Sequence, residues 1–447
     1  MYKRLSAILL VLPFTLGATF SEPVTDQTLA NGLRVIVKVD NRSPVVVSQL
    51  WYRVGSMDEV PGKTGLSHML EHMMFKGTKT LKSGEFSKII ARNGGRENAF
   101  TTQNYTTYFQ TLEKSRLPIA MKLEADRMQN LQFKDDEFKH ERAVVIEERR
   151  LRTDDKPEGR LYESFLNAAY KVSPYGRPVI GSMKDLKNLT VDDARKWYLK
   201  WYVPNNATLV IVGDVKPKNV IKLAKKYFGS IPRGRLPERH IPVEPIQNKT
   251  RSVVLKIPAR VPSILIGFHT PVIGQDKEEW EPYALDMLAG VLDGGDSARF
   301  SSDLIRRKHI AASADAGYDS VSRAPSLFTI SATPYSGKSI ESLKNALIQE
   351  VDKLKRKLVT PEEMKRIRAQ VIASDVFQRD SMFYQGMEIG MLTTSGLDWR
   401  LADDYVSRIE QVTPQQIQAV VKKYLTPENM TVAILHPVRP KKKGGRS

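Results

Sequence analysis

The sequence contains the stretch Val203-Pro204-Asn205-Asn206-Ala207-Thr208-Leu209-Val210-Ile211-Val212, and a similar one, Thr426-Pro427-Glu428-Asn429-Met430-Thr431-Val432-Ala433-Ile434, near its C-terminus. In each copy a threonine before the stretch is placed to cap a helix, and a β-branched run then favours a strand. One constant offset between matched residues indicates an internal duplication. The matched pairs, each 223 residues apart, are Thr190 and Thr413, Pro204 and Pro427, Asn206 and Asn429, and Thr208 and Thr431.

A proline-rich segment separates the two copies. Ile231–Lys249 contains four prolines and no hydrophobic periodicity, which disfavours both helix and central strand. We therefore predict an N-terminal domain at 24–232, a linker at 233–249 and a homologous C-terminal domain at 250–437. Within the copies, β-branched runs alternate with amphipathic stretches such as Lys114–Met128. This mixture predicts an α+β fold with two homologous domains, each a largely antiparallel sheet with helices.

Composition is that of a folded globular protein. The 447 residues are 41% hydrophobic and 27% charged. The absence of cysteine excludes disulfides and a thiol nucleophile. A net charge of +19 favours acidic partners such as anionic lipid, nucleic acid or acidic peptides. The basic residues are dispersed, however, and only Lys441–Lys443 in the basic tail 438–447 forms a dense run. Without a binding motif we predict no nucleic-acid partner.

The N-terminus has the pattern of a secretory signal. Lys3 and Arg4 precede the apolar run Leu5–Ala18, and small residues follow it before Glu22. We predict a signal peptide at 1–21 and no stable transmembrane span. In a Gram-negative bacterium this predicts export across the inner membrane to the periplasm. The alternative is an uncleaved N-terminal membrane anchor.

The motif His68-Met69-Leu70-Glu71-His72 is the sharpest chemical signal. On a helix, His68 and His72 project from one face, with Glu71 beside them. Two imidazoles suit Zn²⁺, and a carboxylate beside the metal can take a proton from bound water. The alternative is an amphipathic helix that contains histidines and binds no metal.

A catalytic zinc site needs a third protein ligand. The helix expected over Glu141–Glu148 is the best source, because Glu141 and Glu148 lie nearly two turns apart and share a face, whereas Glu147 points about 100° away. One carboxylate of that face can bind metal and the other can support it. From this segment alone, however, a solvated acidic pair at Glu147 and Glu148 is the simpler interpretation.

Together these motifs resemble the insulinase/pitrilysin family of inverted zincins, in the branch of the mitochondrial processing peptidase and short bacterial members. The family carries His-x-x-Glu-His followed by Glu-Arg-x-Val-Val-x-x-Glu, and both patterns are present here. The resemblance implies half of a clamshell and one Zn²⁺ per chain, held by His68, His72 and Glu148. It implies that Glu71 is the general base that activates zinc-bound water and that Glu141 supports the site from outside the ligand set. Further matches are Gly94–Thr101, Pro174–Pro178 and Pro204–Ala207.

The resemblance also implies a peptide substrate. In the family, an edge strand pairs with extended peptide, and Asn98, Ala99 and Thr101 are the matching positions here. Ordinary turn and strand roles are the alternative for these three residues.

One segment departs from the family pattern. Active single-chain members supply an Arg and a Tyr seven residues apart, but Ile305 and Ala312 hold those positions here. Neither side chain can donate a hydrogen bond to an oxyanion. We therefore expect a paralogous subunit to supply both groups in a heterodimer, and otherwise a homodimer. Arg306 or Arg307 with Tyr318 are substitutes at the wrong spacing.

Two other functions stay open. One is a noncatalytic peptide-binding or scaffolding subunit. The other is a polybasic protein that binds membranes or nucleic acid in a salt-dependent way.

Overall fold

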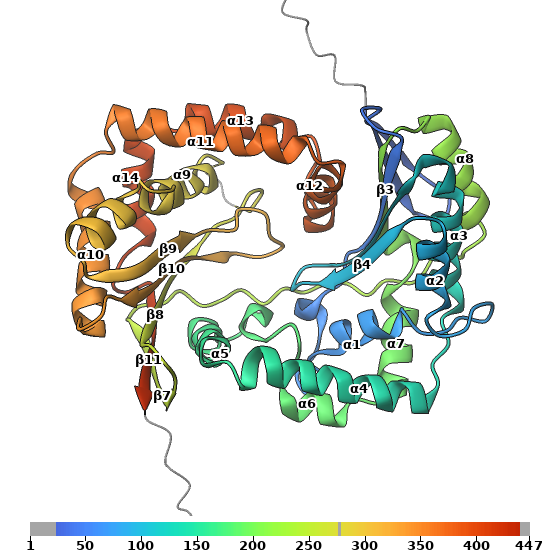
Figure 1. The fold of residues 1–447 in the computed structure, drawn as a ribbon, viewed down its shortest axis with the longest axis horizontal. Helices are drawn as coiled ribbons and strands as arrows, with labels where there is room; N and C mark the ends of the chain where they lie inside the picture. Colours follow the sequence, from blue (N-terminus) through green and yellow to red (C-terminus); the bar gives the residue numbers. More distant parts are fainter. Residues whose placement is uncertain (1–23, 276–278, 439–447) are drawn as a thin grey trace, which may run out of the picture.

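The computed structural model describes residues 24–275 and 279–438 (Figure 1). The predicted signal peptide 1–21 and the tail beyond Val438 lie outside the described residues. None of the described helices combines the length and the apolar character that a bilayer span requires.

Two sheets organise the described chain. The first has the order β1-β2-β6-β3-β5-β4, and only β2 and β6 run parallel. Its strands are β1 (Thr25–Thr28), β2 (Arg34–Val39), β3 (Val45–Tyr52), β4 (Arg96–Thr101), β5 (Thr106–Glu113) and β6 (Ala207–Gly213).

The second sheet repeats this topology without a counterpart of β1. Its order is β7-β11-β8-β10-β9, and only β7 and β11 run parallel. Its strands are β7 (Arg251–Pro258), β8 (Ser263–Thr270), β9 (Ala311–Gly317), β10 (Ser326–Pro334) and β11 (Met430–Val438). The register repeats too. The matched residues Thr208 and Thr431 pair with Arg34 and Arg251, which are the first residues of β2 and β7. The predicted α+β fold with two homologous, largely antiparallel sheets is confirmed.

Helices surround both sheets (Figure 1). In the first half they are α1 (Leu66–Met73), α2 (Glu85–Arg92), α3 (Leu117–Asn130), α4 (Asp135–Arg149), α5 (Pro157–Ala169), α6 (Met183–Asn188), α7 (Val191–Trp201) and α8 (Pro217–Phe228). In the second half they are α9 (Glu281–Asp293), α10 (Ile340–Arg356), α11 (Pro361–Arg379), α12 (Met382–Ser395), α13 (Leu401–Gln411) and α14 (Pro414–Tyr424). The helix predicted at Lys114–Met128 begins later, at Leu117, because Lys114–Arg116 form a short 3₁₀ turn and Pro118 favours a helix start.

The duplicated residues have the same structural tasks in both copies. Thr190 caps α7 and Thr413 caps α14, each through a reciprocal capping box with the residue three positions on. The Asn206 amide donates to the carbonyl of Trp201 (2.9 Å), and the Asn429 amide donates to that of Tyr424 (2.8 Å). Each asparagine thereby ties the end of a helix to the strand that follows.

The two halves exchange one helix each. Helix α5 packs on the second sheet, where Phe165 is buried with Ala433 and Leu435. Helix α12 packs on the first sheet, where Ile389 is buried with Trp51. Burial of apolar surface in both contacts stabilises the arrangement of the halves.

The segment 229–250 between α8 and β7 contains neither helix nor strand. It is nevertheless fastened to the first half. The Glu244 carboxylate accepts backbone N–H groups of Lys171, Val172 and Ser173, and Arg239 pairs with Asp58. The predicted boundaries at 232 and 250 stay predictions.

Candidate metal centre

Helix α1 carries the His-x-x-Glu-His motif, and its N-terminus is closely packed. Gly65 adopts φ +86°, and a Cβ there would lie 2.5 Å from the carbonyl oxygen of Ile180, so only glycine fits. The buried Glu59 carboxylate accepts the N–H groups of Gly65 (2.8 Å) and Ser67 (2.7 Å). A carboxylate at this end satisfies helix N–H groups that have no partner within the helix.

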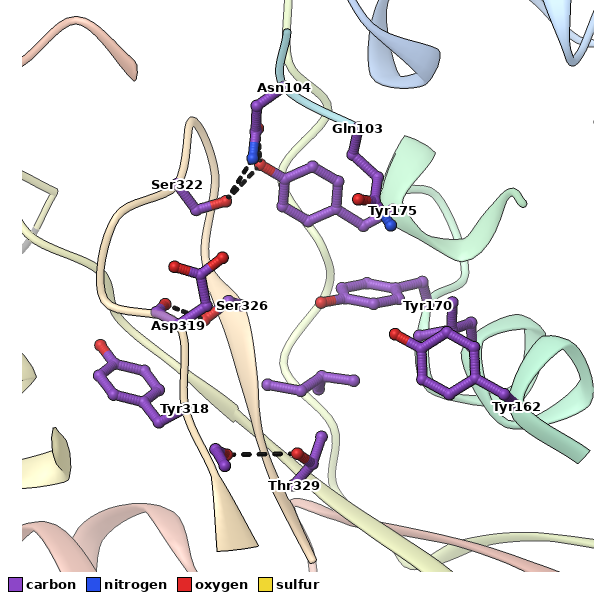
Figure 2. Close-up of a pocket in the computed structure, with 13 residues that line it drawn as sticks. Gln103, Asn104, Tyr162, Tyr170, Tyr175, Tyr318, Asp319, Ser322, Ser326 and Thr329 are labelled. Carbon is purple, nitrogen blue, oxygen red and sulfur yellow. Dashed lines mark hydrogen bonds between the residues drawn. The ribbon is translucent and has the colours of Figure 1, made fainter. Parts of the chain in front are cut away.

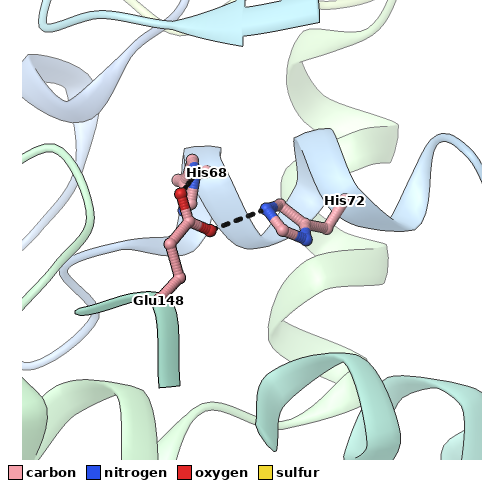
Figure 3. Close-up of side chains that lie close together, drawn as sticks. All are labelled: His68, His72 and Glu148. Atoms are coloured by element: carbon pink, nitrogen blue, oxygen red, sulfur yellow. Dashed lines mark ion pairs between the residues drawn. The ribbon is translucent and has the colours of Figure 1, made fainter. Parts of the chain in front are cut away.

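The two imidazoles of α1 meet one carboxylate of α4 (Figure 3). Nε2 of His68 lies 3.8 Å from Oε1 of Glu148, and Nε2 of His72 lies 3.3 Å from Oε2 of Glu148. One ligand atom from each residue falls within 4.8 Å of the others. Ligands about 2.1 Å from a tetrahedral zinc lie about 3.4 Å apart, so two imidazole nitrogens and a carboxylate at these spacings fit zinc.

Glu141 lies on the side of the His72 ring that faces away from Glu148. Nδ1 of His72 donates to Oε1 of Glu141 (2.9 Å), and Nζ of Lys76 lies 2.5 Å from Oε2. Nε2 of His72 is thereby directed toward Glu148, in the arrangement that orients metal-binding imidazoles. Glu147, by contrast, is 59% exposed and pairs with Arg150. The structure thus separates Glu147 from Glu141 and Glu148, as their spacing indicated.

Glu71 lies beside the imidazoles and is bonded to strand β4. The Thr101 hydroxyl donates to Oε2 of Glu71 (2.5 Å), whereas Oε1 accepts no hydrogen bond within the described residues. Burial raises the pKa of Glu71, and the Thr101 hydrogen bond partly opposes this. One carboxylate oxygen is therefore fixed and the other is available for proton transfer.

The electrostatics of the centre are asymmetric. Burial lowers the pKa of His68 to about 4, so this imidazole is neutral at pH 7. Burial opposes protonation of His72 as well, but hydrogen bonds to Glu141 and Glu148 outweigh it and raise its pKa to about 9. Burial acts against the Glu141 carboxylate, yet hydrogen bonds from His72 and Lys76 lower its pKa to about 2. With Glu141 and Glu148 ionised, the donor set suits a divalent cation.

A cavity of about 710 Å³ opens over the centre. The three ligand candidates and Glu71 line it together with Asn98, Ala99 and Thr101 of β4. Strand β4 is the last strand of its sheet, and its outer edge is unpaired among the described residues. The structure thus brings all the predicted site residues to one cavity except Glu141, which lies behind His72. Peptide binding by β4 stays a prediction.

Several residues that line the cavity were not predicted, among them Arg152, Tyr162 and Leu166. Arg152, on the π-helical turn Arg150–Asp154, contacts Oε1 of Glu148 at 2.7 Å, and Tyr162 and Leu166 of α5 form a wall. The four-residue spacing from Glu148 to Arg152 was a usable signal for the first contact. No local signal places α5 near the centre, because α5 is held by the second sheet.

Ile305 and Ala312 lie in the second half, on the turn Phe300–Arg307 and on edge strand β9. Both are apolar, so neither donates a side-chain hydrogen bond. The substitutes considered above are engaged elsewhere: Arg306 bonds the carbonyl of Asp296, Arg307 pairs with Asp303, and Tyr318 donates to the carbonyl of Pro271.

Two protein-family models match most of the chain. Residues 34–183 match the family described as Insulinase (Peptidase family M16), and residues 188–371 match the Peptidase M16 inactive domain. His68, Glu71, His72 and Glu148 all lie within the first match. The sequence after residue 188 contains no second His-x-x-Glu-His, which agrees with the description of the second match.

Individual relatives agree with these matches. The chain is 36% identical over 377 residues to the zinc protease PqqE of Helicobacter pylori, covering 82% of this chain and 83% of that protein. The crystal structure of a protease from H. pylori superposes with a TM-score of 0.87 at 33% identity, covering 93% of this chain and 99% of that one.

The fold of this chain also matches part of a longer protein. The periplasmic protease PqqL of Escherichia coli superposes with a TM-score of 0.76 at 19% identity, covering 93% of this chain but only 49% of that one. The fold of this chain thus corresponds to half of that protein, as expected for half of a clamshell. With both halves matched and a relative 36% identical over most of its length, the chain belongs to the insulinase family, peptidase family M16.

Proposed function

We propose that this protein is a zinc-dependent endopeptidase that hydrolyses short or unfolded polypeptides. The observation that carries the proposal is the convergence of His68, His72 and Glu148 beside a buried carboxylate, Glu71, in a cavity bordered by an unpaired strand edge. The zinc proteases among its relatives support the same chemistry.

His68, His72 and Glu148 would hold one Zn²⁺. A zinc ion in this position supplies a Lewis acid that polarises a carbonyl and lowers the pKa of a water. Glu141 keeps the His72 imidazole oriented through Nδ1. Thr101 holds Oε2 of Glu71, so Oε1 is the atom that takes a proton from water and later returns it to the leaving amine.

Strand β4 would position the substrate. An extended peptide that adds to its free edge would gain main-chain hydrogen bonds from alternate residues of the segment that contains Asn98, Ala99 and Thr101. Thr101 belongs to this edge strand and its hydroxyl contacts Glu71. A peptide on the edge would therefore have a peptide bond close to the base. The cavity volume of about 710 Å³ suits an extended segment rather than a folded domain.

A second subunit would complete the site. Ile305 and Ala312 provide no oxyanion donor, and the chain corresponds to half of a longer family protease. We infer that a paralogue without the zinc motif supplies an Arg and a Tyr across a shared chamber. A homodimer is the alternative assembly. The pattern of residues 1–21 and the periplasmic PqqL relative support export to the periplasm, with an uncleaved anchor as the alternative.

The test is hydrolysis of an internally quenched, unstructured peptide by the purified full chain, alone and mixed with a candidate paralogue. We expect activity that a chelator removes and that zinc restores, and a large gain on mixing. Full activity of the chain alone would contradict the shared site but not the peptidase. A noncatalytic peptide-binding subunit would bind the peptide and cleave it in neither condition.

A further inference from the structure

Helix α8 carries a stripe of lysines on the flank of the first half that faces away from the second half (Figure 1). The stripe consists of Lys218, Lys222, Lys225 and Lys226, whose spacings of four, three and one residues place them within about 100° of one another around the helix. All four residues are exposed, and no ion pair joins them to a carboxylate within the described residues. Like charges four residues apart weaken a helix, so the stripe has a cost that a bound anion would relieve.

The opposite side of α8 attaches the helix to the protein. This side is apolar, and α8 packs on β2 and α3. Its buried residues are Val220, Ile221, Ala224 and Phe228. Because the apolar side is covered, α8 cannot insert it into a bilayer as a free amphipathic helix would. The attraction that the lysine stripe exerts is therefore electrostatic.

Further cations extend the stripe. Lys216 precedes α8, Arg233 and Arg235 follow it, and the sequence from 215 to 237 contains no Asp or Glu. Arg116 and Lys122 lie at the start of the neighbouring helix α3 and within it. These five residues are also exposed. We call them, together with the four lysines of the stripe, the basic face.

The basic face is not neutralised from within the protein. Two acidic residues lie at the end where α8 begins, but Asp214 is paired with Lys114, and Glu113 accepts the backbone N–H of Ser115 (3.0 Å). On other helices, exposed lysines pair with a carboxylate three or four residues away, as Lys139 does with Asp135. The cations of the basic face have no such partner in the described chain, so their charge is available to an anion outside the protein.

The N-terminus of the described chain lies at the same end of the first sheet as the start of α8. Thr25 of β1 pairs with Val37, and Val39 pairs with Gly213, four residues before α8 begins. The predicted segment 1–21 brings the chain to a membrane in both of its interpretations, as a signal peptide and as an uncleaved anchor. Among anionic surfaces, a membrane is therefore the one that this protein meets on its predicted route.

We propose that the basic face binds the surface of a bilayer that contains anionic phospholipids. Its central stripe is lysine only, and an ammonium group is a compact charge that suits a diffuse layer of phosphates, whereas arginine is the residue that reads base edges in nucleic acids. No residue of α3 or α8 is among those that line the cavity over the metal centre. The bound protein thus keeps that cavity accessible, and the inference does not rest on the proposed peptidase function.

The experiment measures binding of the full chain to sedimenting vesicles of phosphatidylcholine, alone or with about one-third phosphatidylglycerol. At low salt we expect at least about tenfold tighter binding to the anionic vesicles, because each lysine near such a surface adds about fivefold in affinity. The preference should vanish at about 1 M salt, where the screening length falls to about 3 Å. An apolar N-terminal segment would bind both kinds of vesicle and cancels in the ratio.

Two variants with equal loss of charge locate the binding surface. The first replaces the stripe by glutamine at Lys218, Lys222, Lys225 and Lys226, and it should lose most of the preference for anionic vesicles. The matched control replaces four exposed lysines of the second half by glutamine, and it should retain the preference. Its positions are Lys256, Lys338, Lys357 and Lys365. Glutamine keeps the side chain long and favours helix, so both variants should unfold in urea like the wild type.

Three results would overturn the proposal. One is equal binding of the wild type to both kinds of vesicle. Another is an equal loss of preference in both variants, which would assign the attraction to net charge rather than to the basic face. The third is a stripe variant that loses binding to duplex DNA but keeps the preference for anionic vesicles, which would assign the face to nucleic acid. Peptide hydrolysis in solution is a separate measurement, and its failure would leave the vesicle results unchanged.

Discussion

The hydroxyl of Thr101 lies 2.5 Å from Oε2 of Glu71 and joins the edge strand β4 to the carboxylate beside the metal centre. In the proposed function, peptide binding and proton transfer would share this contact. A change in the position of β4 would then be transmitted directly to Glu71.

Replacing Thr101 tests this link. Thr101→Val keeps the shape and removes the hydroxyl, and we expect kcat to fall about tenfold, because a hydrogen bond to a charged group contributes about 1.5–3 kcal/mol. Thr101→Ser, which restores the hydroxyl, should recover most of the rate. Equal kcat values for the Val and Ser variants would show that the contact has no part in turnover.

Glu141 is expected to control metal affinity without contacting the metal. Glu141→Gln weakens the hydrogen bond that Glu141 accepts from Nδ1 of His72, and zinc affinity should fall about 10–100-fold. Competition with a chromophoric chelator measures this. Glu147→Gln on the same helix is the control, since Glu147 faces solvent. If both variants bind zinc like the wild type, the orienting role is wrong.

Sequence and structure agree best where local signals suffice. The capping threonines, the strands that contain Thr208 and Thr431, and the helical arrangement of His68, Glu71 and His72 follow from short patterns. The convergence of Glu148 with that helix followed from the family resemblance, because α1 and α4 are distant in sequence.

What the sequence did not predict depends on contacts between the halves. The exchange of α5 and α12 arises from burial on a sheet that each helix reaches only in the folded chain. The cavity of about 300 Å³ between the halves (Figure 2) follows from that exchange, since Tyr162 and Tyr170 line it together with the loop 317–326, about 150 residues away. Periodicity identifies an apolar face but not the surface that covers it.

The packing of α12 on the first sheet gives a stability prediction. A Cβ at Gly390 would lie 2.0 Å from Cε2 of the fully buried Trp51. Helix propensity alone predicts that Gly390→Ala stabilises by about 1 kcal/mol. The steric conflict should reverse the sign, and we expect a loss of about 2 kcal/mol in urea unfolding. An increased unfolding midpoint would contradict the close contact.

Asp286 gives a prediction for the pH dependence of stability. Burial raises its pKa from 3.8 to about 7, and hydrogen bonds from the side chains of Ser320 and Tyr405, the latter long at 3.4 Å, oppose this shift only in part. The folded state therefore binds this proton more tightly than the unfolded state. The resulting stabilisation is complete below pH 4 and is lost as the pH rises to 7.

Comparison with Asp286→Asn isolates this effect. The free energy of unfolding of the variant minus that of the wild type should increase between pH 4 and pH 8 by on the order of 4 kcal/mol, because the pKa rises by about three units and one unit corresponds to about 1.4 kcal/mol. Urea unfolding at the two pH values measures it. A difference that does not change with pH would contradict the burial of an ionisable Asp286.

The central claim is that Glu71 acts as the proton-transfer group beside a zinc held by His68, His72 and Glu148. The most direct measurement is zinc content together with peptide turnover in Glu71→Gln, in the same assembly in which the wild type is active. We predict one zinc per chain and a turnover at least about 100-fold lower, the usual contribution of a general base. Turnover within a few-fold of the wild type in the zinc-loaded variant would contradict the claim.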